Sequence, residues 1–193
     1  MEDRVRSAEA IRQIAVIGAG FMGHGIGQEF AVAGCEVVLH DVSEAALDRA
    51  RDRIGANLAQ LAAWGIVPAG TPAAALERIR ATTDLAEAAR GADLAVEAVY
   101  EDLALKREVL GALDRLCPAR TILASNTSTF VPSLLASATG RPDRVLGMHY
   151  FYPPALLPLV EIVPGAGPSP ETVDTVQGLL RSMGKRPIVV RQE

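Results

Sequence analysis

Short apolar runs alternate with longer alanine-rich segments along the chain. The runs are rich in β-branched residues and are bounded by glycine, proline or acidic residues, which is typical of buried strands. We therefore expect strands at residues 13–17, 36–40, 93–98, 121–124, 144–149, 158–163 and 186–191. Strands that alternate with helical segments favour a mostly parallel sheet with helices on both faces. The pattern predicts a doubly wound α/β fold.

The helical segments between the first strands carry start signals of their own. A first helix is expected over residues 21–33. Ser43 is a good N-cap for a second helix that reaches about residue 63, whereas Thr71 as N-cap and Pro72 as first helical residue start a third helix through about residue 79. The second and third helices exceed a minimal crossover between two strands. We expect them to form a helical hairpin, about residues 43–80, that projects from the domain.

A glycine-rich turn follows the first strand. It reads Gly18-Ala19-Gly20-Phe21-Met22-Gly23, a Gly-x-Gly-x-x-Gly motif between a strand-like and a helix-like run. In a dinucleotide-binding turn the first glycine permits the tight turn, the second lets the backbone approach a pyrophosphate, and the third lets the helix pack on the strand. Glycines that simply punctuate a loop are the alternative. The position between strand and helix favours a Rossmann-type site for a dinucleotide.

Asp41 strengthens this interpretation. It ends the second strand-like run, about 20 residues after the glycines, where an acid can accept hydrogen bonds from the ribose hydroxyls. Its charge would repel a 2′-phosphate, so NAD is favoured over NADP as the cofactor. The helix that starts after the glycines offers free N–H groups and a positive dipole end to the phosphates.

The composition is that of an ordinary globular protein. The chain has 193 residues, 49% of them hydrophobic and 22% charged, with a net charge of −4. That charge argues against nucleic acid or an anionic membrane as the main partner. The first residues, 1–6, lack the apolar core of a signal peptide, and no run is long enough to span a membrane. Cys35 and Cys117 have no metal-like spacing, so we expect a cytoplasmic protein without a metal.

A histidine and an acid in the second half suggest acid–base chemistry. His149 ends the expected strand 144–149, and Glu161 lies 12 residues further on, inside the apolar run 158–163. Ligands of doubly wound sheets bind at the carboxyl ends of the strands. An acid in a buried strand needs a partner, and a His–Glu pair forms a general base whose carboxylate orients the imidazole. A structural ion pair, or a histidine bonded to backbone, is the alternative.

Five separate blocks resemble the N-terminal domain of the 3-hydroxyacyl-CoA dehydrogenase family. The resemblance extends over essentially all 193 residues, and its blocks are 18–26, 96–106, 124–128, His149 with Pro153, and 159–161. It implies one NAD-binding domain over residues 1–193. It also implies NAD-dependent oxidation of a 3-hydroxyacyl-CoA to the 3-oxoacyl-CoA, or the reverse reduction, with an acyl thioester as substrate.

The resemblance also implies roles for individual residues. His149 would take the substrate hydroxyl proton, Glu161 would orient His149, and Ser128 would hydrogen-bond the reacting oxygen. Asn126 matches an active-site asparagine near cofactor and substrate. A turn or helix cap is the alternative for residues 126–128.

Glu101 and Lys106 match family positions that contact NAD. The alternative is that they form a solvated charged face of a helix, together with Glu97, Asp102 and Arg107.

The chain departs from the family in three ways. Tyr152 stands where the family has an asparagine after the catalytic histidine, which puts substrate shape in doubt. The stretch 57–64 of the hairpin has no lysine for CoA phosphates, and Arg49, Arg51 and Arg53 lie earlier in the helix. This favours, as an alternative, a small hydroxy acid or an acyl group on a carrier protein.

The third departure is length. The family continues after the last strand into an all-helical domain that closes the cleft, and this domain is absent from the 193 residues. We expect NAD binding but poor turnover by the chain alone, and self-association through the face that the helical domain would cover. A non-catalytic NAD-binding module is the rival hypothesis, against which the intact set of Ser128, His149 and Glu161 argues.

Overall fold

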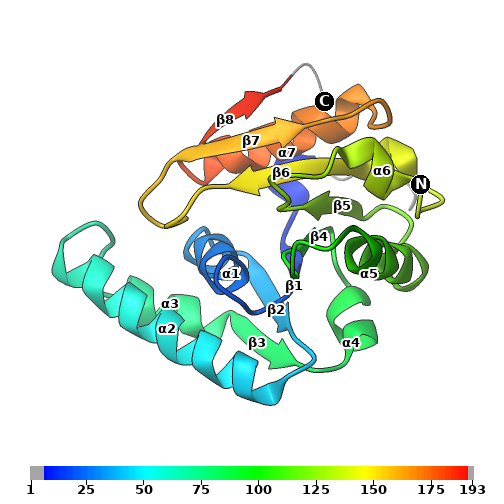
Figure 1. The fold of residues 1–193 in the computed structure, drawn as a ribbon. Helices are drawn as coiled ribbons and strands as arrows, with labels where there is room; N and C mark the ends of the chain where they lie inside the picture. The colour runs from blue at the N-terminus through cyan, green and yellow to red at the C-terminus, as the bar shows by residue number, and fades with distance from the viewer. Residues whose placement is uncertain (1–6, 191–193) are drawn as a thin grey trace.

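A computed structural model describes residues 7–190. The ends of the expected domain, 1–6 and 191–193, lie outside the described residues, including the last residue of the strand expected over 186–191. A single sheet runs through the molecule in the order β3-β2-β1-β4-β5-β6-β7-β8 (Figure 1). Its strands are β1 (Gln13–Ile17), β2 (Glu36–His40), β3 (Ile79–Thr82), β4 (Leu94–Glu97), β5 (Ile122–Ser125), β6 (Val145–Tyr150), β7 (Leu159–Val163) and β8 (Arg186–Val189).

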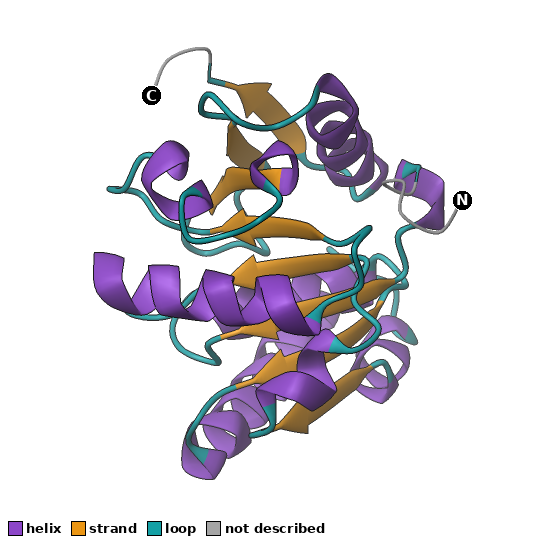
Figure 2. Ribbon diagram, turned by 90° about the vertical axis from the view of Figure 1, so that its right-hand side faces the viewer, coloured by secondary structure: helices purple, strands orange, loops and turns teal. Residues whose placement is uncertain are grey.

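Helices cover both faces of this sheet, with α1 on one side and α5 on the other (Figure 1 and Figure 2). They are η1 (Ala8–Ala10), α1 (Gly23–Val32), α2 (Glu44–Ala63), α3 (Thr71–Glu77), α4 (Leu85–Ala89), α5 (Leu103–Leu116), α6 (Pro132–Ala136), η2 (Pro142–Arg144) and α7 (Pro170–Ser182). One apolar core lies between the sheet and α1, α2, α3 and α7, and a second lies between the opposite face and α4, α5 and α6. The doubly wound α/β fold expected from the alternation of strands and helices is confirmed.

The central strands are buried on both faces because helices cover each of them. Every residue of β4 and β5 is buried, and only the first residue of β1 and of β2 is exposed. Continuous apolar runs, rather than alternating ones, are what such strands require. This explains why the apolar runs marked these strands in the sequence.

The pairing of β6 with β7 is the one antiparallel pairing of the sheet; the other described pairs are parallel. In this register His149 lies directly opposite Glu161. Because β6 and β7 run in opposite directions, residues 12 apart in sequence become cross-strand neighbours.

The helical hairpin is formed by α2 and α3, which lie beside α1, and its connecting loop extends away from the sheet (Figure 1). Ser43 caps α2 as expected, accepting a hydrogen bond from the Ala46 N–H. Two expectations here were wrong. Thr71 is the first helical residue of α3, and Gly70 is its N-cap. The helix ends at Glu77, and residue 79 begins a strand, β3, that was not expected from the sequence.

The reason for the missed strand is its exposure. β3 is an edge strand whose residues are intermediate or exposed, so no continuous apolar run marks it. Within residues 7–190, no helix is both long and apolar enough to cross a membrane.

Candidate active site

In the turn after β1, contacts within the protein leave no space for a side chain at two of the glycines. Gly18 has a φ of +102°, and a Cβ there would lie 2.6 Å from the Ala98 carbonyl oxygen. A Cβ on Gly23 would lie 1.7 Å from the Gly18 carbonyl oxygen. Any side chain at either position would therefore displace the backbone of the turn.

Gly20 differs from these two glycines. A Cβ at this position would meet no heavy atom within 4 Å, and φ of Gly20 is not positive. The fold therefore gives no steric reason for a glycine there. A ligand that packs against the backbone at Gly20 would give such a reason, and a pyrophosphate in a dinucleotide-binding turn packs in this way. The turn thus fits NAD.

The start of α1 and Asp41 complete the cofactor side. The N-cap of α1, Met22, makes no side-chain capping bond, so the first-turn N–H groups face the turn without a side-chain acceptor. Asp41 Oδ2 accepts a hydrogen bond from the Ala19 N–H at 2.9 Å, and Oδ1 accepts one from the Ser43 N–H at 3.0 Å. Each carboxylate oxygen keeps a lone pair for a ribose hydroxyl. Asp41 thus also holds the glycine turn, a role that the sequence did not reveal.

Glu97 and Lys106 form a buried ion pair at the end of β4. Their side chains are 0% and 1% exposed, and Lys106 Nζ lies 2.8 Å from Glu97 Oε1. Glu97 also accepts hydrogen bonds from the Val99 N–H at 2.8 Å and from Ser125 Oγ at 2.5 Å. For Glu97 and Lys106, the alternative of a solvated charged face is wrong. Glu97 lies inside the strand expected over 93–98, so the rule that an acid in a buried strand needs a partner could have found this pair.

Lys106 reaches a second acid, Glu101. Its Nζ lies 3.1 Å from Glu101 Oε2 and donates to the Val99 carbonyl oxygen at 3.3 Å, so each of its three N–H groups has an acceptor inside the protein. Glu101 is 40% exposed and also accepts a hydrogen bond from the Thr127 hydroxyl. Lys106, Glu101 and Thr127 therefore connect the end of β4 with the loop after β5.

That loop holds Asn126 and Ser128 in different ways. Asn126 Oδ1 accepts a hydrogen bond from the Tyr150 N–H at 2.8 Å, which joins the ends of β5 and β6. The turn itself is stabilised by Thr127, whose hydroxyl accepts from the Thr129 and Phe130 N–H groups. Ser128 is exposed at the surface of this turn. The turn function considered for residues 126–128 thus belongs to Thr127, which the sequence analysis did not single out.

His149 and Glu161 are in contact, as expected. His149 Nδ1 lies 2.9 Å from Glu161 Oε2, and their side chains are 19% and 31% exposed. A carboxylate at Nδ1 favours the tautomer of a neutral imidazole that carries its proton on Nδ1 and leaves the lone pair on Nε2. The His149 ring also contacts the Phe151 ring at a centroid distance of 4.6 Å. The pair has the arrangement of a general base with an orienting acid.

Tyr152 connects the segment after β6 to the glycine turn. Its ring stacks on that of Phe21, with centroids 4.0 Å apart and planes inclined by 25°. Both rings are more than half exposed. Tyr152 therefore joins the segment after β6 to the glycine turn.

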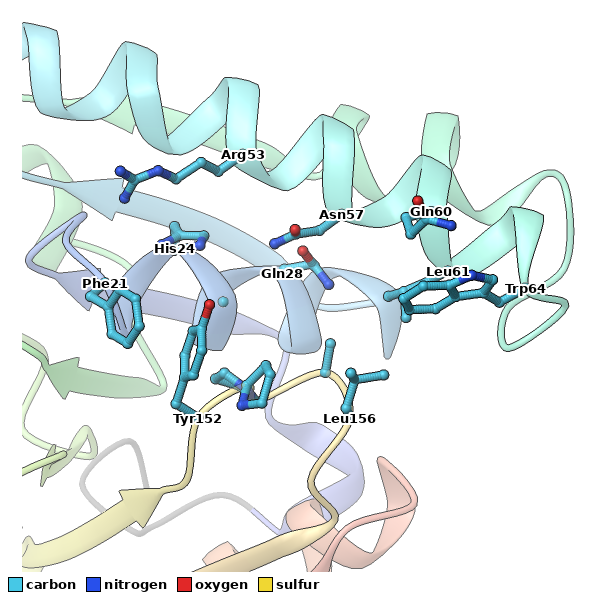
Figure 3. Close-up of a pocket in the computed structure, with 14 residues that line it drawn as sticks. Phe21, His24, Gln28, Arg53, Asn57, Gln60, Leu61, Trp64, Tyr152 and Leu156 are labelled. Atoms are coloured by element: carbon cyan, nitrogen blue, oxygen red, sulfur yellow. The ribbon is translucent and has the colours of Figure 1, made fainter.

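A cleft of about 460 Å³ begins at this aromatic pair (Figure 3). Its floor is α1, one wall is α2, and the other wall is the segment 151–158 between β6 and β7. Polar lining residues are His24, Gln28, Arg53, Asn57 and Gln60, and apolar ones include Leu61, Trp64, Pro154 and Leu156. Arg53 is the one charged lining residue, and Figure 3 shows it extending from α2 over His24.

The floor of the cleft is polar but buried. Gln28 is 0% exposed, and neither its Nε2 nor its Oε1 has a hydrogen-bond partner among the described residues. His24 Nδ1 donates to the Gly20 carbonyl oxygen at 2.7 Å, and burial lowers the pKa of His24. Over residues 7–190, no group of three or more acidic, histidine or cysteine side chains could hold a metal ion.

Known proteins of one family are similar to this chain in sequence and in structure. The family model described as "3-hydroxyacyl-CoA dehydrogenase, NAD binding domain" matches residues 13–193. A 3-hydroxybutyryl-CoA dehydrogenase of Clostridioides difficile is 40% identical over 180 residues, which are 93% of this chain and 64% of that protein. A 5-formyl-3-hydroxy-2-methylpyridine 4-carboxylate 5-dehydrogenase of Mesorhizobium japonicum is 38% identical, over 95% of this chain and 58% of that protein.

Solved structures agree with this assignment. The crystal structure of (S)-3-hydroxybutyryl-CoA dehydrogenase from Ralstonia eutropha superposes with a TM-score of 0.90 at 35% identity, over 95% of this chain and 64% of that one. The chain therefore spans roughly three-fifths of the length of these relatives. It belongs to the 3-hydroxyacyl-CoA dehydrogenase family, and what it contains is the NAD-binding domain.

Proposed function

We propose that this chain takes part in the NAD-dependent oxidation of a 3-hydroxyacyl-CoA to the 3-oxoacyl-CoA, or in the reverse reduction. The observation that carries the proposal is the His149–Glu161 pair at the carboxyl edge of the sheet. Asn126 is bonded to the same edge, and the open backbone at Gly20 lies at the carboxyl end of β1. A site of this kind, with a base next to a dinucleotide turn, serves hydride transfer.

In the proposed mechanism the protein supplies proton transfer and orientation. His149 Nε2 removes the proton of the substrate hydroxyl, and Glu161 stabilises the imidazolium that forms. The exposed hydroxyl of Ser128 donates a hydrogen bond to the reacting oxygen. Bound NAD supplies the chemistry of hydride acceptance. In the reverse direction, the imidazolium of His149 returns the proton to the carbonyl oxygen.

The residues that would hold NAD follow the edge of the sheet. The backbone of residues 18–23 would take the pyrophosphate, and Asp41 would accept hydrogen bonds from the adenosine ribose. Glu101 and Asn126 would lie near the nicotinamide end. Lys106 has all three N–H groups occupied, so we propose that it acts on the cofactor by holding Glu101 and the Val99 backbone.

A second candidate is the oxidation of a small substrate that carries its own carboxylate. The cleft favours it, because Arg53 is the single charge in the lining and the wall formed by α2 has no lysine for the phosphates of CoA. The Mesorhizobium relative is named for a pyridine carboxylate substrate. We propose CoA thioesters first because several relatives are named for them. In either case we propose a cytoplasmic enzyme with no nucleic-acid or membrane partner.

The test is a comparison of His149→Gln with the unchanged sequence in a full-length enzyme that also carries the helical domain of the family, because we expect poor turnover by the 193 residues alone. Turnover of acetoacetyl-CoA with NADH should fall on the order of 10²–10⁴-fold, the usual contribution of a general base. NAD affinity, measured by calorimetry, should change little because His149 acts on the substrate oxygen. Equal turnover by the variant would contradict the assignment of His149. Turnover of small hydroxy acids but not of acetoacetyl-CoA would favour the second candidate.

A further inference from the structure

Lys185 lies between α7 and β8, far in sequence from the residues discussed so far, and it is only 8% exposed. Its Nζ is 2.5 Å from Glu29 Oε2, 2.6 Å from the Pro154 carbonyl oxygen and 3.5 Å from the Leu157 carbonyl oxygen. An ammonium group has three N–H donors, and here each has an acceptor. Lys185 therefore bonds to two separate parts of the fold at once.

Those two parts are the floor and one wall of the cleft. Glu29 belongs to α1, the floor, on the turn of helix that follows Gly25. Pro154 and Leu157 belong to the segment 151–158, the wall that also carries Tyr152. Among the described residues, no direct hydrogen bond joins this segment to α1. Pro154 packs on Gly25 of α1, and Tyr152 stacks on Phe21 in the turn before α1.

The packing at Gly25 shows how tightly this wall approaches the floor. A Cβ on Gly25 would come within 3.1 Å of Pro154 Cγ. The far end of the segment is held by the Arg186 N–H, which donates to the Pro158 carbonyl oxygen at 2.7 Å. The segment is thus fixed at its start by Tyr152, in its middle by Lys185 and at its end by β8.

The Lys185–Glu29 pair is poorly explained by stability alone. Their side chains are 6% and 13% exposed, and burial raises the pKa of the Glu29 carboxyl although Lys185 opposes the rise. Buried ion pairs are costly to desolvate, and apolar residues of similar volume are often equally stabilising. What an apolar pair cannot do is direct bonds to two specified carbonyl oxygens of a loop.

We propose that Lys185 is a positioning residue for the cleft, which sets the position of the segment 151–158, and with it Tyr152, relative to α1. The proposal rests on the proposed function in one respect, namely that the cleft receives the acyl substrate. Loss of the Lys185 bonds frees the wall while leaving the glycine turn intact. Substrate affinity then falls, and NAD affinity does not.

The experiment uses three variants of the 193-residue chain and two measurements. Lys185→Met alone leaves Glu29 buried without a partner, so the double variant Glu29→Gln/Lys185→Met provides a version without the unpaired charge. Arg186→Met is the matched control, because Arg186 is an exposed neighbouring cation whose contact with the segment is through its backbone. Hydrogen exchange of residues 151–158 is measured first. Acetoacetyl-CoA affinity follows from the fluorescence of Trp64, the single tryptophan, which lines the cleft.

The double variant should fold, exchange faster in residues 151–158 than the unchanged chain, and bind acetoacetyl-CoA on the order of tenfold more weakly, because small displacements of a binding wall have large effects. The control should match the unchanged chain in both measurements. Unchanged exchange of 151–158 in the double variant overturns the proposal. If the unchanged chain itself fails to bind acetoacetyl-CoA, the assignment of the thioester to the cleft fails, whereas the exchange measurement still decides the role of Lys185.

Discussion

Gly20 and Gly23 lie three residues apart in the same turn, yet the structure gives them different reasons to be glycine. A Cβ at Gly23 would collide with the Gly18 carbonyl oxygen, whereas a Cβ at Gly20 would enter open space. Side chains at these two positions should therefore have separable effects on folding and on ligand binding.

Gly20→Ala should leave thermal stability nearly unchanged and weaken the binding of NAD, because the added methyl group occupies the space of the pyrophosphate. Gly23→Ala should instead lower the melting temperature, since the turn must move to accept it. Calorimetric titration with NAD and a thermal melt of each variant check this pair. A Gly20→Ala variant that binds NAD as tightly as the unchanged chain would show that no ligand packs against this backbone.

Asp41 combines a structural and a proposed binding role. It accepts hydrogen bonds from the Ala19 and Ser43 N–H groups and keeps lone pairs for ribose hydroxyls. Asp41→Ala should weaken the binding of NAD by about 1–3 kcal/mol, the usual loss for hydrogen bonds to a charged group. Asp41→Asn, the control, keeps an acceptor while removing the charge that disfavours a 2′-phosphate, so it should gain affinity for NADP relative to NAD. Tighter binding of NADP than of NAD by the unchanged chain would contradict the cofactor preference.

At the scale of elements, side chains at strand ends connect neighbouring strands and loops. Glu97 at the end of β4 bonds to Ser125 of β5 and to Lys106 of α5, and Asn126 joins the ends of β5 and β6. The carboxyl edge of the sheet, where the proposed site lies, is thus held rigid by buried polar contacts.

Lys106→Met should destabilise the protein strongly, by roughly 3–5 kcal/mol, because it leaves the fully buried Glu97 carboxylate without its cation. Arg107→Met is the control, since Arg107 is the exposed next residue of α5 and its loss should change stability by less than about 0.5 kcal/mol. Urea unfolding followed by circular dichroism measures both. Equal stabilities for the two variants would show that Glu97 finds another partner.

At the scale of the whole molecule, two buried histidines make stability depend on pH. Burial is the main cause that lowers the pKa of both His24 and His40 below the reference value of 6.5. For His40, the nearby charges of Asp41 and Asp84 act in the opposite direction and raise its pKa, but burial has the larger effect. The folded state therefore binds their protons less readily than the unfolded chain. Their contribution to stability is fully present above pH 6.5 and is lost as the pH falls below it.

The free energy of unfolding should accordingly decrease as the pH is lowered from about 7.5 to about 5. Urea titrations at a series of pH values measure it. In the double variant His24→Gln/His40→Gln the decrease should be smaller, because the groups that gain protons on unfolding are gone. An identical pH dependence in the variant would assign the effect to carboxylates instead.

Much of this protein could be predicted from local sequence. The central strands are buried on both faces, so they appear as apolar runs, and β1, β2, β4, β5, β6 and β7 were located within a residue or two. The glycine turn has a chemical signature confined to six residues. The His149–Glu161 pair was predictable because His149 ends one apolar run, Glu161 lies inside the next, and an acid in a buried strand needs a partner.

Only the tertiary structure decided which residues that are distant in sequence come into contact. The edge strand β3 lacks an apolar run, and the antiparallel direction of β7 depends on how the chain returns after β6. The partners of Glu97 and of Lys185, and the cleft between α1, α2 and residues 151–158, exist because the order of strands in the sheet makes those elements neighbours. Local periodicity reports which face of an element is buried, but it does not report what that face packs against.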